Sequence, residues 1–398
     1  MRVVTGLILS GGGARAAYQV GVLQAIEQMR RERTPARGNP YGVICGTSAG
    51  ALNAAVLACG ADDYGEALDR LFGLWSELRT SQVYRAHLKD MVGAGLRWMG
   101  LMTLAGWLTP SPQAGSWRPR ALLDHTPLAQ LLEEHLDFTR LPGLLRDGHL
   151  QALAVGALSY GCGEHVTFYQ SHQAIEPWCR SRRLSHRDAL GIGHLLASAA
   201  IPLVFPATPL SGPHGLDYFG DGSMRQSAPL SPAIHLGANK LLVIGAGRMH
   251  EARTTGTRPG TLASEPSLAQ IAGQVLSGLF QDALAGDVEQ LERINRMLQT
   301  LPPALVDVTD LRPVQCLLIT PSQSLDDLAA RHAQHLPGTM RHLLRKLGTD
   351  HRQDQGMALL SYLLFEQPYT RALLAMGQAD ALARRAEIEA FFGWTVAA

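Results

Sequence analysis

The sequence Gly46-Thr47-Ser48-Ala49-Gly50 joins a short apolar run, residues 41–45, to a helix-like run, residues 49–59. A G-x-S-x-G sequence between a strand and a helix is typical of a nucleophile elbow. In such a turn the serine backbone is strained, and the hydroxyl is exposed at a helix N-terminus, where the dipole favours negative charge. Because 41 of the 398 residues are glycine, the motif alone carries a substantial false-positive risk. Other features of the chain have to support it.

A second glycine-rich turn lies near the start of the chain. Residues 6–10 predict a buried strand, which continues through Gly11-Gly12-Gly13-Ala14-Arg15 into a helix with apolar residues at helical spacing. Such a turn exposes backbone N–H groups at the positive end of a helix, where they bind a phosphate or an oxyanion. A tight turn without any ligand is the alternative.

The same glycines also fit the dinucleotide-binding pattern G-x-G-x-x-G/A, from Gly11 to Ala16. That function requires an acidic residue at the end of the second strand, to hold the ribose hydroxyls. Here the second strand ends in Cys45-Gly46-Thr47-Ser48, so the sequence argues against a nucleotide. A P-loop is excluded, because no Gly-Lys-Ser/Thr follows the glycines.

A third feature is Asp221-Gly222, which follows the apolar residues Tyr218-Phe219 and predicts a strand that opens into a turn. An isolated Asp-Gly is most often an ordinary turn. Together with the two glycine-rich turns, however, it makes the chain resemble the patatin-like phospholipases. The order and spacing of the matching segments agree with that family over roughly residues 5 to 247, and the segments are residues 11–15, 46–50, 197–206 and 221–222.

The resemblance implies a three-layer α/β/α fold with a largely parallel central sheet, and hydrolysis of acyl esters in lipids by a Ser–Asp dyad. Ser48 would attack the ester carbonyl, and Asp221 would accept the hydroxyl proton. Four residues would form the oxyanion hole through their backbone N–H groups: Gly11, Gly12, Gly13 and Ala14. Arg15 either anchors this loop to nearby carbonyls, as the resemblance implies, or is a solvated helix residue.

Three positions depart from the family pattern. Ala16 follows the loop arginine in place of glycine, Ser223 follows Asp-Gly in place of glycine or alanine, and Ser227 stands in place of asparagine. Each substitute is small, so loop closure is expected to be kept. The alternative to an enzyme is an inactive lipid-binding or regulatory protein on the same scaffold, against which the presence of both Ser48 and Asp221 argues.

The base could in principle be one of fifteen histidines, but none lies in a motif with an assigned place. Asp217 is the nearest competitor of Asp221, and it lacks the following glycine that would let Ser48 and substrate approach. Because the carboxyl ends of parallel strands lie at one edge of a sheet, we expect Ser48 and Asp221 to meet there. Their oxygens should lie within about 2.6–3.2 Å of each other.

The composition indicates a globular protein with a substantial core: 46% of the residues are hydrophobic and the formal net charge is +1. A nucleic-acid partner would usually require a more basic chain. Five scattered cysteines predict no disulfide framework and a reducing cytoplasm. No Cys/His cluster has metal-ligand spacing and H-E-x-x-H is absent, so we expect no catalytic metal and no cofactor. The early core strand predicts that there is no signal peptide.

Residues 1–250 are expected to form the catalytic domain, with a lid or interfacial insertion at 80–118. Within the insertion, residues 91–108 are rich in Trp and Met and hold one charge. They either contact a lipid surface, pack in the core or, although short and broken by glycines, span a membrane. The resemblance implies lipid acyl esters as partners, phospholipid or lysophospholipid foremost, and the apolar run predicts transient contact with a membrane surface. The basic stretch 180–187 either binds anionic headgroups or is a solvated loop.

Residues 251–266, rich in Thr, Gly and Pro, predict a loop or linker. Residues 267–398 are expected to form a mostly helical region with one strand at 315–320, packed on the same domain. Alternating strands and helices predict a largely parallel sheet. The expected strands are 3–10, 42–46, 150–160, 164–170, 216–219 and 240–245, and the expected helices are 14–30, 48–59, 126–135 and 187–198.

Overall fold

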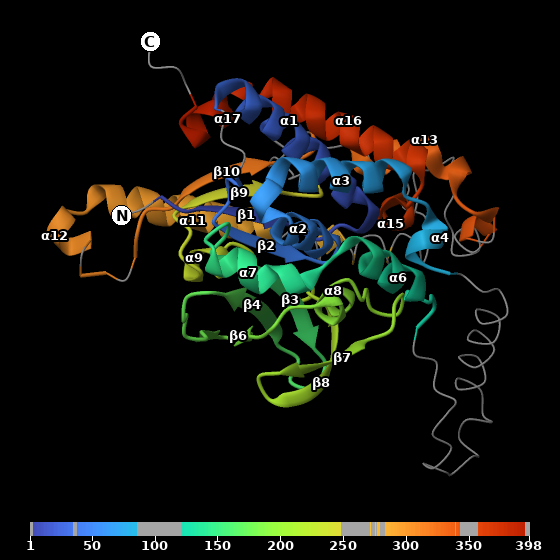
Figure 1. Cartoon of the computed structure of the whole chain (residues 1–398), viewed down its shortest axis with the longest axis horizontal. Coiled ribbons are helices and arrows are strands. Elements are labelled where there is room, and N and C mark those ends of the chain that lie inside the picture. Colours follow the sequence, from blue (N-terminus) through green and yellow to red (C-terminus); the bar gives the residue numbers. More distant parts are fainter. Residues whose placement is uncertain are drawn as a thin grey trace, which may run out of the picture.

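A computed structural model describes residues 3–34, 38–85, 121–247, 283–306, 308–309, 311–338, 340–342 and 357–394, and also residues 271, 275, 277 and 278. The apolar run 91–108, most of the expected insertion 80–118 and the expected linker 251–266 lie outside these residues. In the described part of the chain, helices and strands form three layers, with α1, α3 and α16 above strands β1, β9 and β10 in the view of Figure 1.

Ten strands of the described residues form one mixed sheet, in the order β10-β9-β1-β2-β3-β4-β6-β5 with the hairpin β7–β8 beside β3. The five strands from β10 to β3 are parallel, whereas β4 and β8 are antiparallel to β3. The strands are β1 (Thr5–Leu9), β2 (Val43–Thr47), β3 (Ala152–Ser159), β4 (His165–Ser171), β5 (Cys179–Arg180), β6 (Arg183–Arg187), β7 (Thr208–Gly212), β8 (Gly215–Asp221), β9 (Lys240–Ile244) and β10 (Gln315–Ile319). The predicted fold class, α/β with a largely parallel sheet, is confirmed.

Side chains alternate between the two faces of the sheet, and each face carries its own hydrophobic core. Leu7 and Leu9 belong to the larger core, which includes residues of α1, α2, α3 and α16, while Ile8 belongs to a second core with α9 and α11. The helices that contribute are α1 (Ala17–Arg33), α2 (Ala49–Cys59), α3 (Tyr64–Glu77), α9 (Ser231–His235), α11 (Ala283–Thr300) and α16 (Gln367–Ala383). Because strands such as β1 are covered on both faces, they read as continuous apolar runs.

Shorter helices complete the described structure. They are α4 (Thr80–Val83), α6 (Thr126–His135), α7 (Leu141–Arg146), α8 (Ile192–Ser198), α12 (Pro303–Val306), α13 (Leu325–His332), α15 (Met357–Leu363) and α17 (Arg385–Phe392). Helix α16 packs along α1, where the hydroxyl of Tyr18 donates to the carboxylate of Asp380 at 3.0 Å. None of the helices in the described residues is long and apolar enough to cross a membrane.

Two local predictions are wrong. The helix expected at 187–198 begins only at Ile192, because residues 183–187 form β6, and the basic stretch 180–187 is thus an edge-strand pair rather than a loop. The pair Thr126-Pro127 predicts that Thr126 is the N-cap of α6, but α6 begins at Thr126 itself, and the Asp124 carboxylate accepts from the Thr126 N–H at 2.9 Å. In both cases a tertiary or neighbouring contact overrides the local pattern.

Candidate active site

Ser48 lies between β2 and α2 in a strained backbone conformation, with φ 53° and ψ −129°. A non-glycine residue in such a region costs about 1–3 kcal/mol and persists only where its surroundings impose it. Gly50 of the motif shows how closely the surrounding backbone encloses Ser48. A Cβ on Gly50 would lie 2.3 Å from the carbonyl oxygen of Leu9, so α2 can begin this close to the end of β1 only with glycine there.

The side chains of Ser48 and Asp221 meet because β2 and β8 run toward each other along the same side of β3. Thr47, the last residue of β2, pairs with Gly156, and Asp221, the last residue of β8, pairs with Ala157. Ser48 follows Thr47 directly, so the ends of the two strands bring both side chains together. The Ser48 hydroxyl donates to Oδ2 of Asp221 at 2.7 Å.

The contact is the one expected from the sequence, but the reason given for it was wrong. We expected both residues at the shared carboxyl edge of parallel strands, and β8 is antiparallel to β3. The glycine after the aspartate is also required by the packing of the backbone. A Cβ on Gly222 would lie 2.1 Å from the carbonyl oxygen of Gly156, so this glycine lets the chain pass β3.

Asp221 is a buried carboxyl, only 1% exposed. Burial is the largest influence on it and raises its pKa from 3.8 to about 6. Hydrogen bonds from the Ser48 hydroxyl and from the Ser223 N–H, at 2.8 Å to Oδ1, lower the pKa and offset burial only in part. The carboxylate is therefore a stronger base than an exposed aspartate and is still ionised at neutral pH.

Ser198 is a site residue to which we had assigned no role. It ends α8, and its hydroxyl accepts from the Ser48 N–H at 2.8 Å while donating to the Gly156 carbonyl at 2.6 Å. Its own carbonyl accepts from the Gly222 N–H at 3.2 Å. Ser198 thus links the elbow, β3 and the turn after Asp221. The only sequence signal was its place in the segment 197–206, which carried the family resemblance.

The glycine-rich loop leads from β1 into a 3-10 turn, Gly13–Ala16, and then into α1. All four residues expected to form an oxyanion hole, Gly11, Gly12, Gly13 and Ala14, are buried. Gly13 has φ 54° and lines the same pocket as Ser48. A Cβ on Gly13 would lie 2.3 Å from the carbonyl oxygen of Tyr362, so the backbone of Tyr362 packs directly against this loop.

Arg15 is buried, with 2% of its side chain exposed, and the solvated alternative is therefore excluded. Its Nη2 donates to the Asp326 carboxylate at 2.5 Å and its Nε donates to the Ser361 hydroxyl at 2.8 Å. The guanidinium carbon lies 3.8 Å from the centre of the Tyr362 ring. These two partners are side chains of α13 and α15, more than 300 residues away in sequence. We call Arg15, Asp326, Ser361 and Tyr362 the loop clamp.

An almost entirely apolar pocket begins at Ser48 and follows α2. Leu52 and Val56 lie four and eight residues beyond Ser48 and so share one helix face, which extends about 12 Å along the axis. The buried side-chain oxygen of Asn53, Oδ1, accepts a hydrogen bond from Nε1 of Trp75 at 2.8 Å. The other lining residues come mainly from α3, α4, α6 and the 199–205 loop and include Leu71, Leu74, Leu78, Val83, Leu128, Leu131, Leu132, Ile201, Phe205 and Phe365.

The competing bases lie elsewhere. Asp217 accepts from the Ser159 hydroxyl and from the Gly161 N–H, which holds it at the β3–β4 turn. His194 is a satisfied core residue, with Nδ1 accepting from the Gly191 N–H at 3.2 Å and Nε2 3.3 Å from the Asp188 carboxylate. Within the described ranges, the partners found for the Ser48 and Asp221 side chains include no histidine.

Comparisons with known proteins place these features in a family. The family model "Patatin-like phospholipase" matches residues 7–234. A 57-residue stretch is 47% identical to lysophospholipase nte1 of Aspergillus terreus, which is 14% of this chain and 3% of that protein. The chain thus spans only a small part of that relative.

Among solved structures, VipD of Legionella pneumophila aligns with a TM-score of 0.31 and 13% identity over 94% of this chain and 67% of its own. Human GIVD cytosolic phospholipase A2 aligns with a TM-score of 0.31 and 14% identity, over 96% and 60%.

The buried Asp221 carboxyl makes the stability of the protein depend on pH. Since its pKa is higher in the folded chain, its contribution is fully present below pH 3.8 and is lost as the pH rises through about 6. Asp221→Asn should therefore be more stable than wild type at pH 8, by about 3 kcal/mol for a shift of this size, and the difference should shrink toward pH 4. Urea unfolding of both proteins across this pH range measures it. A difference that does not vary with pH would contradict the raised pKa.

Proposed function

The chain belongs to the patatin-like phospholipase family, and on this premise we propose that it is a serine lipid acyl hydrolase of the phospholipase A or lysophospholipase type. The observation that carries the proposal is the contact between the Ser48 hydroxyl and the Asp221 carboxylate, 2.7 Å long, at the end of an apolar pocket. The nucleophile, the base and a binding site for an acyl chain are then adjacent.

In the proposed mechanism, the Ser48 oxygen attacks the ester carbonyl while its proton passes to Oδ2 of Asp221. The tetrahedral oxyanion is held by backbone N–H groups of Gly12 and Gly13, with Gly11 and Ala14 as further donors. Asp221 returns the proton to the leaving alcohol, which departs and leaves Ser48 acylated. Water then attacks the acyl-enzyme with Asp221 again as base, releasing a fatty acid. No metal or cofactor enters this reaction.

The alternative is an inactive lipid-binding protein on the same scaffold. The pocket alone would serve either function, because an acyl chain is bound by apolar contact in both. The strained Ser48 backbone and the hydrogen-bonded, ionised Asp221 favour the enzyme, since a protein that only binds lipid gains nothing from either.

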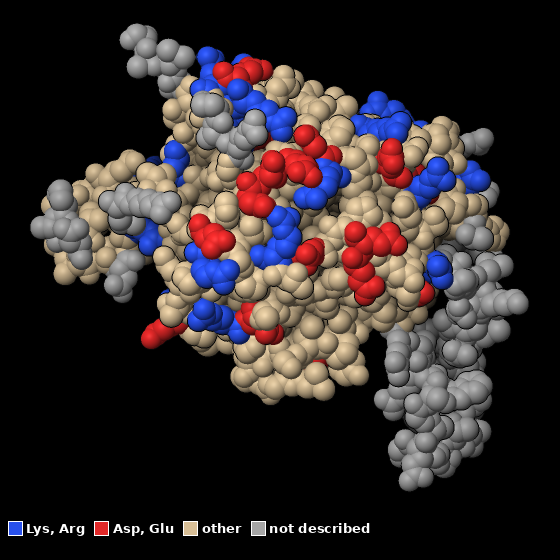
Figure 2. Space-filling view, viewed as in Figure 1, with Lys and Arg blue, Asp and Glu red and all other residues tan. Residues whose placement is uncertain are grey.

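We also propose a lipid surface as the transient partner, which would make the protein peripheral to a membrane, and we propose the cytoplasm as its compartment because its cysteines are few and scattered. Leu203 is 68% exposed and has φ 66°, and it lies between Ile201 and Phe205, which line the pocket. Leu216 and Tyr218 of β8 are also exposed. The lower part of the face in Figure 2, over β7 and β8, carries few charged side chains. Exposed apolar side chains suit contact with a membrane surface, and Leu203 stands between two residues that line the pocket.

A fluorophosphonate probe tests the assignment of Ser48. We expect the probe to label Ser48 in the wild-type protein and to leave Ser48→Ala unlabelled, and we expect the variant to lose ester hydrolysis by at least about a thousandfold. Because Asp221 must be ionised to accept a proton, kcat/KM should fall as the pH drops below about 6. Lipid binding without labelling would support the inactive scaffold, and wild-type turnover by Ser48→Ala would refute the role of Ser48.

The pocket along α2 predicts a limit on acyl chain length. Val56→Trp should block its far part, while Val56→Ala should leave it open. For Val56→Trp we expect kcat/KM on long-chain esters to fall about fourfold for each methylene that is no longer buried, since one methylene contributes about 0.8 kcal/mol. Hydrolysis of butyryl esters should not change. Comparison of butyryl and palmitoyl esters on the two variants measures this, and equal losses on both esters would argue for another acyl site.

The loop clamp predicts that Asp326 positions the oxyanion hole through Arg15. Asp326→Asn should lower kcat/KM about ten- to hundredfold, with the apparent pKa of the reaction still about 6, because Asp221 is untouched. The affinity for a trifluoromethyl ketone that mimics the tetrahedral adduct should fall in parallel, and binding of a non-hydrolysable ether lipid should not. Asp62→Asn is the matched control, since Asp62 is similarly exposed and paired with Arg140. An equal effect of the two substitutions would refute the clamp.

A further inference from the structure

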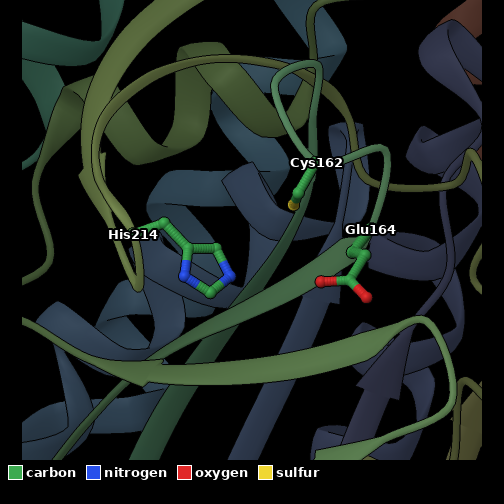
Figure 3. Close-up of side chains that lie close together, drawn as sticks. All are labelled: Cys162, Glu164 and His214. Carbon is green, nitrogen blue, oxygen red and sulfur yellow. The ribbon is translucent and has the colours of Figure 1, made fainter.

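Two turns at the far end of the β3–β8 pair bring together three side chains with different donor atoms. Cys162 and Glu164 lie in the turn between β3 and β4, and His214 lies in the turn between β7 and β8. The thiol sulfur, a carboxylate oxygen and an imidazole nitrogen all lie within 4.8 Å of one another. Figure 3 shows the three side chains directed into the same space between the turns.

This donor set matches the preferences of one common metal ion. Thiolate and imidazole are the usual protein ligands of Zn²⁺, and carboxylate completes many of its sites. Calcium and magnesium take oxygen ligands and would not use the sulfur. In a tetrahedral zinc site, bond lengths of about 2.0–2.3 Å put donor atoms about 3.3–3.8 Å apart. A separation of at most 4.8 Å needs only about 1 Å of closure.

We propose that Cys162, Glu164 and His214 bind a zinc ion, with water in the fourth position. Binding releases the thiol proton of Cys162 to solvent and forms a zinc–thiolate bond, with no change of oxidation state. Hydrogen bonds already hold this turn in place. The Ser159 hydroxyl accepts from the Cys162 N–H at 3.1 Å and donates to the Asp217 carboxylate, which is the kind of outer contact that fixes a ligand in place.

The ion would fasten the hairpin that carries Asp221. His214 precedes β8, whose last residue is Asp221, so the site lies about 20 Å from the carboxylate along the strand. At that distance zinc takes no part in the chemistry at Ser48. It would instead join the β7–β8 turn to the β3–β4 turn, in addition to the three residue pairs between β3 and β8. The site is therefore independent of the proposed hydrolysis, and its effect would be on the stability of the hairpin.

Thiol protection tests the site without measuring activity. The reduced, chelator-treated full chain is titrated with zinc chloride and then pulsed with N-ethylmaleimide, and each cysteine is quantified by mass spectrometry. Cys162 and Cys179 are both exposed, so the second is an internal control. We expect zinc to slow alkylation of Cys162 at least about tenfold, as metal coordination ties up the thiolate, and to leave Cys179 unchanged. Cobalt in place of zinc should give thiolate-to-metal charge-transfer absorption.

Variants separate a built site from chance binding. His214→Ala should abolish both the protection of Cys162 and the cobalt absorption, and Glu164→Gln should weaken zinc binding about ten- to hundredfold. His172→Ala is the control, because His172 is another exposed histidine of the same sheet region and should behave as wild type. Thermal unfolding without zinc should be the same for all variants. Equal protection of Cys162 and Cys179, no protection, or protection that survives His214→Ala would overturn the proposal.

Discussion

The backbone pairing of β3 is the constraint on which the site depends. Gly156 pairs with the end of β2 and Ala157 pairs with the end of β8, so two strands that approach from opposite directions end at adjacent residues of a third. That register leaves no room for slippage, because a shift of one residue would turn every side chain of β8 to the other face. The Gly156 carbonyl is also the acceptor for Ser198, which in turn holds the N–H of Ser48.

The same arrangement explains how an aspartate would serve as the base in the proposed reaction. Its position at a strand end in the core excludes water, and burial raises its pKa to about 6 while the Ser48 hydroxyl and the Ser223 N–H still hold the charged form. An exposed aspartate would be too weak a base for a serine hydroxyl. The buried charge lowers the free energy of unfolding at neutral pH, because it destabilises the native state. The strained conformation of Ser48 adds to that cost, and the extensive core beneath α1 and α2 offsets it.

The part of the chain beyond the family match contributes to the core of the structure. The match ends at residue 234, yet β9 and β10 extend the sheet beside β1, and α16 covers α1. The loop clamp belongs to this part as well, because Asp326 and Ser361 bind Arg15 and the Tyr362 carbonyl contacts Gly13. The glycine-rich loop is thus fixed on one side by its own helix and on the other by segments that occur more than 300 residues later. A buried arginine needs such partners, since an uncompensated charge at that position would be very unfavourable.

Which features could be predicted from the sequence depends on how far apart in the sequence the interacting residues lie. Ser48, the glycine-rich loop and the apolar strands are specified by neighbours within a few residues, and their patterns predicted the α/β class. The contact with Asp221 was predicted from the family resemblance. The direction of β8 was not predictable, because Tyr218-Phe219-Gly220-Asp221 reads the same in a parallel or an antiparallel strand. Asp326 and Ser361 carried no signal, since nothing near them in sequence resembles a binding motif. Cys162 and His214 were not predicted as metal ligands for the same reason. Metal-ligand motifs describe residues at short spacing in one turn or helix. These two residues belong to two turns, which come together only because β3 pairs with β8.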